Sequence, residues 1–205
     1  TYNYGTGTST DNIFPDFMKG KHLTNLLLPE SVTRIDANAL NNCDNIKEIT
    51  IPDNVTSIGS YAFSGSESLS VINVSGNSKL QTIEERALQE TDLKNVDFSQ
   101  VQQLETIGQY AFYSSSLISI LLPTSLKTIG ESAFRLCVSL HSITVTVAEI
   151  KPYTFAGCYG LERVTIGEGT ISIGEYAFER CWVLNSVSLP ESLKSIGGYA
   201  FSGCS

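Results

Sequence analysis

The chain has 205 residues, of which 41% are hydrophobic, enough for a sizeable buried core and too many for a disordered chain. Its net charge of −8 argues against nucleic acid and anionic lipid as partners, because both need a basic surface. No apolar stretch approaches the roughly 20 residues that span a bilayer, and no signal peptide is visible. Since the first residue is Thr1 rather than Met, we expect a processed or engineered fragment.

Residues 1–20 lack the regular pattern of the rest of the chain. Residues 1–11 are rich in Gly, Thr, Ser and Asn, a composition typical of mobile termini. Apolar residues at Ile13, Phe14 and Phe17 suggest a remnant of a repeat or an N-terminal cap. We therefore expect a partly flexible leader or partial cap over residues 1–20.

From residue 21 onward a unit of about 23 residues recurs eight times. Each unit contains a segment with the pattern apolar-x-x-apolar-x-apolar, whose alternation is the period-2 signal of a half-buried strand. The eight segments are residues 23–28, 46–51, 69–74, 93–98, 117–122, 140–145, 161–166 and 184–189.

After each strand the unit continues through a turn to an Ile, followed by Gly in five copies and then by an Ala-Phe step. The five are Gly59, Gly108, Gly130, Gly174 and Gly197. Gly at this place predicts a tight bend with positive φ. The Ala-Phe step predicts a short helical or 3₁₀ turn on the outer side.

The length of the turn after the strand changes in three copies. It is longer from Val74 to Ile83 and from Phe98 to Ile107, and shorter from Val145 to Ile150. Such changes in solenoids map to loops on one face, often the binding face, although neutral drift in a tolerant loop is the simpler explanation.

One unit cannot bury its own Leu, Ile and Phe, so stacked units must bury them against each other. Eight strands at ~4.8 Å spacing would form a parallel sheet about 34 Å long. We therefore expect a repeat solenoid over residues 21–205. The chain stops inside a repeat without a polar cap, so we expect the domain to be truncated at its C-terminus and the parent chain to continue.

The segments Leu184 to Cys204 and Leu117 to Cys137 both follow the order Leu-x-x-Ile/Val-x-Leu, Ser-Leu, Ile-Gly, Ala-Phe, Cys. This order resembles the BspA-like leucine-rich repeats of bacterial and protist surface proteins. The resemblance implies a right-handed leucine-rich-repeat solenoid with a parallel concave β-sheet and short helical, 3₁₀ or irregular outer segments. It also implies an extracellular, cell-surface or secreted setting, a role in adhesion or host interaction, and no catalytic residue.

Five cysteines occupy one column of the repeat, each four residues after the Ala position, where other copies hold Ser66, Thr91 and Ser115. They are Cys43, Cys137, Cys158, Cys181 and Cys204. We interpret the column as a ladder of buried small side chains. No metal site is expected, because the cysteines lack the paired spacing and the His partners of metal ligands. Disulfides between stacked neighbours would be geometrically demanding.

Three further sets of residues have alternative interpretations. His22 and His141 lie too far apart to cooperate and are expected on the surface. Glu84 and Glu85 could in principle do carboxylate chemistry, but a solvated face is the simpler interpretation. A Tyr column before the Ala-Phe step indicates edge packing or an aromatic contact strip for protein or glycan: Tyr61, Tyr110, Tyr153, Tyr176 and Tyr199.

The sheet residues between the buried ones should face the concave side and form the binding surface. They are mostly small, neutral and hydrogen-bonding, and Leu27 and Leu121 are apolar exceptions that could anchor a partner. The candidate ligand-binding residues are Asn25, Leu27, Glu48, Thr50, Asn73, Asn95, Asp97, Leu121, Thr144, Arg163 and Thr165.

Taken together, the sequence predicts a monomeric, non-catalytic module that binds a protein or a glycan and needs no cofactor. Nucleic acid is not an expected partner, and the fragment is not expected to insert into a membrane. Two alternatives remain: a spacer or stalk that presents another domain, and an accessory domain of an enzyme whose catalytic part lies elsewhere.

Overall fold

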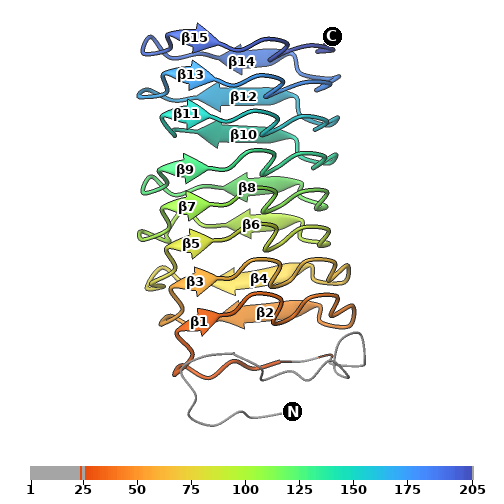
Figure 1. Ribbon diagram of the computed structural model, residues 1–205, viewed down its shortest axis with the longest axis vertical. Coiled ribbons are helices and arrows are strands. Elements are labelled where there is room, and N and C mark those ends of the chain that lie inside the picture. Colours follow the sequence, from red (N-terminus) through yellow and green to blue (C-terminus); the bar gives the residue numbers. More distant parts are fainter. Residues whose placement is uncertain (1–23, 25, 205) are drawn as a thin grey trace.

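The computed structural model describes residue 24 and residues 26–204. Figure 1 shows turns of chain stacked along one axis, with the N-terminal turns at the bottom and the C-terminal turns at the top. Two parallel ladders of strands run along this axis, and the strands of one ladder point opposite to those of the other. The described residues contain strands and turns but no helix, so the architecture is a parallel β-solenoid. The expected segment 1–20 lies outside the described residues.

The first ladder consists of the strands that the repeat pattern predicts. They are β2 Glu48–Ile51, β4 Val71–Val74, β6 Asn95–Asp97, β8 Ser119–Leu121, β10 Ser142–Val145, β12 Arg163–Ile166 and β14 Ser186–Ser188. Residues 24 and 26–28 of the first expected segment form no strand. The hydrogen-bonded pairing runs in three groups, β2-β4, β6-β8 and β10-β12-β14, so the expected continuous sheet is interrupted twice.

A second ladder, which the sequence interpretation placed in turns, is formed by two-residue strands that end at the Ile of each unit. They are β1 Arg34–Ile35, β3 Ser57–Ile58, β5 Thr82–Ile83, β7 Thr106–Ile107, β9 Thr128–Ile129, β11 Glu149–Ile150, β13 Ser172–Ile173 and β15 Ser195–Ile196. This ladder pairs from β1 to β9 and again from β11 to β15. Its break coincides with the shortened turn between Val145 and Ile150.

The Ala-Phe segments are chains of tight turns rather than the expected helical or 3₁₀ turns. In the unit around Ala177, backbone N–H groups of Ala177, Glu179 and Cys181 donate to the carbonyls three residues earlier. The third residues of the first and last of these turns, Tyr176 and Arg180, have φ of 56° and 58°. A positive φ at this place is a feature of type II turns and interrupts a helix.

The N–H groups that these turns leave over donate hydrogen bonds to the neighbouring unit. These bonds join successive units along the outer side. Tyr176, Phe178 and Arg180 donate to the carbonyls of Gly198, Ala200 and Ser202, at 3.1, 2.7 and 2.7 Å. Alternate N–H groups therefore serve the turn and the stack, and the backbone groups of this buried segment find partners.

The Gly that follows Ile in five units has a reason other than the one expected. Positive φ is found at other glycines, such as Gly65 and Gly157, and not at Gly174. A Cβ on Gly174 would lie 2.6 Å from the backbone nitrogen of Pro152 and 2.7 Å from the carbonyl carbon of Lys151. Gly is needed here because the backbone of the previous turn passes too close for a side chain.

The core lies between the two ladders and the outer turns, and it is filled by one layer of Leu, Ile and Phe from each unit. From Phe112 to Phe201 the Phe rings form a continuous stack with centroids 5.1 to 5.4 Å apart. Complete burial of one such side chain contributes about 1.5–3 kcal/mol. Each layer packs on the layers of the neighbouring units. This packing keeps the strands of successive units in a fixed register.

Candidate functional site

The candidate ligand-binding residues lie on the outward face of the first ladder, as the alternation of each strand dictates. All ten that the structure describes are exposed, with Leu27 at 63% and Leu121 at 55%. Asn25 lies outside the described residues. The strand register aligns the side chains into two columns, pairing Thr50 with Asn73, Asp97 with Leu121 and Thr144 with Thr165.

Among the described residues, side-chain hydrogen bonds on this face link β4 to β2 and β8 to β6, the second from Ser119 Oγ to Asn95 Oδ1 at 2.8 Å. The Asn73 amide donates to Glu48 Oε1 at 2.7 Å and to Thr50 Oγ1 at 3.4 Å, which links β4 to β2. Hydrogen bonds from Ser99, including its backbone N–H at 2.8 Å, lower the pKa of the Asp97 carboxyl. These hydrogen bonds stabilise the charged form of Asp97, which shares a mostly uncharged face with Glu48 and Arg163.

The face is hollowed where strand pairing is interrupted. A hollow of about 470 Å³ lies at the break between β4 and β6, and its lining includes Thr50, Asn73, Asn95 and Asp97. The break between β8 and β10 holds a smaller hollow of about 270 Å³, with Leu121 and Thr144 in its lining. A third hollow, of about 550 Å³, lies beside β2 and is lined in part by Leu27, Glu48 and Thr50. Arg163 and Thr165 line none of these three.

Turn residues that the sequence interpretation missed complete the hollow between β4 and β6. Glu30, Asp53 and Ser75 follow residues 26–28, β2 and β4, respectively, and contribute to its lining. Ser75 and Asp53 are joined by a short hydrogen bond between their side chains. The longer turn between Val74 and Ile83 begins at Ser75, so the insertion was a signal that could have identified this residue.

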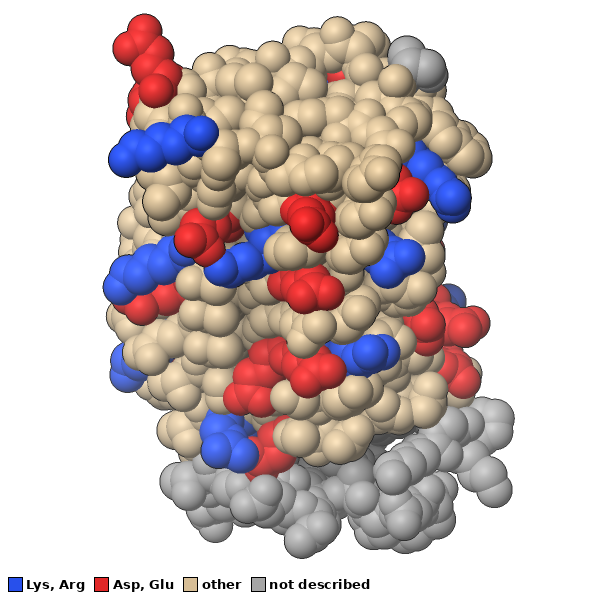
Figure 2. All heavy atoms as spheres, turned by 45° about the horizontal axis from the view of Figure 1, so that its top comes forward, with Lys and Arg blue, Asp and Glu red and all other residues tan. Residues whose placement is uncertain are grey.

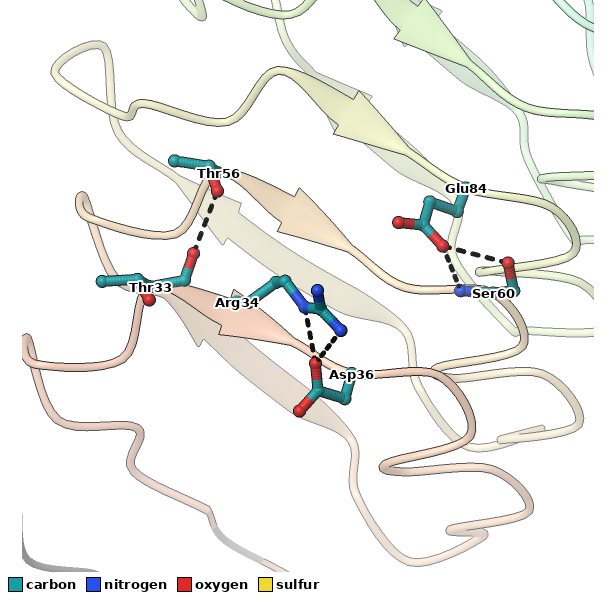
Figure 3. Close-up of polar contacts among 6 residues, drawn as sticks. All are labelled: Thr33, Arg34, Asp36, Thr56, Ser60 and Glu84. Carbon is teal, nitrogen blue, oxygen red and sulfur yellow. Dashed lines mark hydrogen bonds and ion pairs between the residues drawn. The ribbon is translucent and has the colours of Figure 1, made fainter. Parts of the chain in front are cut away.

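A second set of polar contacts lies near the second ladder, where two carboxylates occupy the position that Gly holds in five other units (Figure 3). Glu84 Oε2 accepts hydrogen bonds from the backbone N–H and the hydroxyl of Ser60, both at 3.0 Å. The buried carboxylate of Asp36 accepts a hydrogen bond from Arg34 Nε at 2.6 Å. Thr56 Oγ1 donates to the carbonyl of Thr33 at 3.1 Å. Two of these three contacts join neighbouring turns, so the cluster ties the stack together.

The cysteine column is a ladder of free thiols, as expected from its spacing. Cys137, Cys158, Cys181 and Cys204 each donate a hydrogen bond to the carbonyl of the Phe one turn earlier. Burial raises the pKa of Cys137 and of Cys181 to about 12. Since a thiol is reactive as its thiolate, this column is inert near neutral pH and serves packing.

The tyrosine column packs along the outer turns. Tyr153, Tyr176 and Tyr199 form a stack with centroids 4.9 and 5.1 Å apart. In the N-terminal part, the guanidinium carbon of Arg86 lies 5.7 Å from the centroid of Tyr61 and 4.4 Å from that of Tyr110. The edge-packing interpretation therefore explains the column.

The remaining chemical candidates do not form a site. His141 is exposed, and His22 lies outside the described residues. Among the described residues, no group of three or more His, Cys, Asp or Glu side chains is placed to hold a metal ion. Figure 2 shows acidic and basic side chains interspersed over the visible face, without a continuous basic patch.

The part of the chain that the structure describes contains no helix with the length and hydropathy of a membrane-spanning segment.

The fold is similar to that of solved bacterial leucine-rich-repeat proteins. A leucine-rich-repeat protein of T. pallidum, TpLRR, shares 29% identity at a TM-score of 0.68, over 75% of this chain and 72% of that one. A leucine-rich-repeat protein from Bacteroides ovatus shares 27% identity at a TM-score of 0.52, over 89% of this chain and 64% of that one. The pneumococcal vaccine antigen PcpA, at 21% identity and a TM-score of 0.58, shares the fold over 85% of this chain and 52% of its own.

Comparison with curated proteins finds no match. The family model described as a BspA type leucine rich repeat region of six copies matches residues 14–106 and again residues 105–205. This match covers most of the chain, and the stacked parallel turns have the architecture of the solved leucine-rich-repeat proteins. The chain therefore belongs to the BspA-type leucine-rich-repeat family.

Proposed function

We propose that this chain is a non-catalytic binding module of a cell-surface or secreted protein, and that it recognises a protein or a glycan with the outward face of the first ladder. The proposal rests on one observation: the ten described candidate residues are all exposed on a single rigid face. Small hydroxyl and amide groups dominate that face, and Leu27 and Leu121 provide exposed apolar anchors.

The hollows at the interrupted strand pairings give this face concave places that a partner could fill. Asp97 and Asn73 lie at one of them, and Leu121 lies at the other. A partner that fills both would span β4 to β10 with polar contacts at one end and an apolar contact at the other. Multivalent contact along a rigid surface gives affinity without chemistry, so we propose that the module acts as a monomer without a cofactor.

The surface location and a role in adhesion or host interaction are supported by the family and by the similar structures. One of those is described as a leucine rich cell surface protein from Faecalibacterium prausnitzii, and PcpA is a vaccine antigen. The B. ovatus protein and PcpA are longer than the part this chain matches. A spacer that presents another domain, or an accessory domain of an enzyme, remains the rival proposal.

The test is surface plasmon resonance of the purified chain against immobilised matrix glycoproteins and a glycan panel. A triple variant, Leu27→Ala, Asp97→Ala and Leu121→Ala, removes both anchors and the Asp97 carboxylate. The matched control is Thr82→Ala, Thr106→Ala and Thr128→Ala on the second ladder. We expect saturable binding that the first triple variant loses and the control keeps, with circular dichroism unchanged. Equal binding by all three proteins, or binding to nothing in either panel, would favour the spacer.

A further inference from the structure

A second surface lies along the edge where the outer turns lead into the first ladder. We name it the edge column: the residues that directly follow the cysteine column, namely Asp44, Glu67, Asp92, Ser116, Val138, Tyr159 and Trp182. Stacking of the cysteine column itself sets their alignment, because the backbone N–H of Cys43 donates to Ser66 Oγ at 3.1 Å and Ser115 contacts Cys137 at 3.4 Å.

A shared hollow at one end and a ring contact at the other place members of the edge column side by side. Glu67, Asp92 and Ser116 line one hollow of about 320 Å³, together with Glu90. At the other end, the Tyr159 and Trp182 rings are stacked with centroids 4.2 Å apart and an angle of 10° between their planes. The edge column is therefore a continuous strip along the solenoid axis.

The two ends of this strip have opposite chemistry. Its N-terminal part carries Asp44, Glu67 and Asp92, with Glu90 in the same hollow, and its C-terminal part carries Val138, Tyr159 and Trp182. The Asp92 carboxylate is already paired with Lys94, whose ammonium lies 3.4 Å away. Val138 is 45% exposed, Trp182 is 52% exposed, and the adjacent Val183 is 45% exposed. A cluster of exposed apolar side chains that includes a Trp is the composition of a binding hot spot.

The ring geometry indicates what this apolar end can contact. Tyr159 and Trp182 each present one ring face to the other, so that pair of faces is closed to a sugar ring. The valines and the ring edges offer aliphatic and aromatic surface instead. Apolar side chains of a polypeptide fit this surface, since they need contact area rather than a free ring face.

Charge complementarity defines the other end of the partner. Carboxylates attract Lys and Arg and repel phosphate, and the whole chain has a net charge of −8. Asp92 and Trp182 are four turns apart, which corresponds to about 19 Å at the ~4.8 Å spacing of stacked strands. An extended peptide covers that distance with about six residues.

We propose that the edge column binds a polypeptide segment that carries apolar side chains at one end and a cluster of Lys or Arg about six residues away. The apolar end contacts Val138, Trp182 and Val183, and the basic end contacts Glu67 and Asp92. This surface is separate from the outward face of the first ladder, so the segment can bind while that face is occupied.

The only Trp of the chain, Trp182, is the reporter for a direct test. The probe is a synthetic Trp-free peptide with four lysines, a six-residue Gly-Ser linker and a Leu-Phe-Leu end. Two further peptides carry only the lysines or only the apolar end. We expect the two-part peptide to shift the Trp182 emission to shorter wavelength, and to bind at least about tenfold more tightly than either half. Equal binding by the two-part and the apolar peptide, or no shift with any peptide, overturns the proposal.

Variants separate the two ends of the strip. Charge reversal by Glu67→Lys with Asp92→Lys should weaken the two-part peptide by about tenfold, while leaving the apolar peptide unaffected. The matched control is Glu131→Lys with Glu175→Lys, which makes the same change in net charge at exposed positions outside the edge column. An equal loss in both double variants would show that net charge alone attracts the peptide, against the proposal.

A second pair of measurements tests the apolar end and the class of partner. Val138→Ser with Val183→Ser keeps the reporter and should abolish the shift with the apolar peptide. Phosphatidylcholine vesicles serve as the alternative ligand, and we expect them to leave the emission unchanged. A shift with vesicles and none with the peptides would assign the apolar end to a lipid surface and overturn the peptide proposal.

Discussion

The N-terminal and C-terminal turns of this solenoid share one backbone but hold neighbouring turns together by different side-chain chemistry. Between β1 and β9, hydroxyl hydrogen bonds, the ion pair of Lys127 with Glu105 and the Arg86 sandwich join neighbouring turns. Leu40 and Leu88 interrupt the Phe column there. From Phe112 onward the Phe rings stack without interruption, and the stack from Tyr153 to Tyr199 and four of the five thiols lie in these C-terminal turns. The repeat thus requires small or flat side chains at defined positions. Hydroxyl, thiol, aromatic and guanidinium groups can all meet this requirement.

The substitution with the largest expected effect on stability removes one ring from the Phe stack. Phe155 is fully buried between Phe134 and Phe178. We expect Phe155→Ala to lower the free energy of unfolding by about 3–5 kcal/mol, because it leaves a cavity and ends two ring contacts. Urea unfolding followed by circular dichroism measures the change. Leu88→Ala at the same place in the N-terminal turns should cost less, and an equal or greater cost would contradict the idea that ring stacking strengthens the C-terminal half.

A second test concerns the Gly after Ile, which lies close to the backbone of the previous turn in both halves of the solenoid. A methyl group on Gly174 would lie 2.6 Å from the Pro152 nitrogen, and one on Gly59 would lie 2.6 Å from the Ala37 nitrogen. We expect Gly174→Ala and Gly59→Ala each to cost about 1–3 kcal/mol, since the backbone of the previous turn must move away. Gly198 has no atom within 4 Å of such a methyl group, so Gly198→Ala is the control and should change stability by less than about 0.5 kcal/mol. If the control costs as much as the other two, close approach is not the reason for Gly.

The thiols of the C-terminal turns predict a dependence on alkaline pH. Burial raises the pKa of Cys137 and Cys181 to about 12, so the folded state retains protons that the unfolded state releases above about pH 9. Their contribution is fully present below the unfolded pKa and is lost as pH rises from about 9 to 12. Each thiol can lower stability by at most about 1.4 kcal/mol per pH unit in that window.

The measurement is the urea midpoint between pH 8 and 11 for the wild type and for the Cys137→Ser, Cys181→Ser variant. Serine does not ionise there, and Ser66 occupies the same position in the N-terminal turns with a hydrogen bond of 2.8 Å to the Leu40 carbonyl. The variant should therefore show the shallower loss of stability. Parallel pH profiles would contradict the burial of these thiols as neutral groups.

The sequence was sufficient to predict the parts of the fold that depend on period and burial. Alternation placed the strands of the first ladder and the exposure of all ten described candidate residues, because a strand has only two faces. The second ladder was missed, since two-residue strands such as Thr82–Ile83 are too short to alternate. The Ala-Phe step was misread because most left-handed residues around it are not Gly but Tyr, Asn, Ser, Arg, Glu or Leu, and side-chain identity alone does not predict that conformation.

The hollows of the candidate site could be located only in part. The longer turns after Val74 and Phe98 pointed to one side of the solenoid, but the gap between β4 and β6 depends on how three consecutive turns pack. The same holds for the edge column. Its residues are contiguous in no part of the sequence, and only the stacked cysteine column brings Asp92 and Trp182 onto one strip.

The smallest expected effect tests the chemistry that replaces ring stacking in the N-terminal turns. Arg86 lies between Tyr61 and Tyr110, half-buried, and it has a φ of 54°. We expect Arg86→Gln to lower the free energy of unfolding by about 0.5–1 kcal/mol, because it removes the cation from two ring faces. Arg163→Gln is the matched control, since Arg163 is exposed and its ion pair with Glu162 spans 3.6 Å. A loss of the same size in both variants would mean that the sandwich adds nothing beyond charge. The N-terminal turns would then depend on backbone hydrogen bonds and buried aliphatic layers alone.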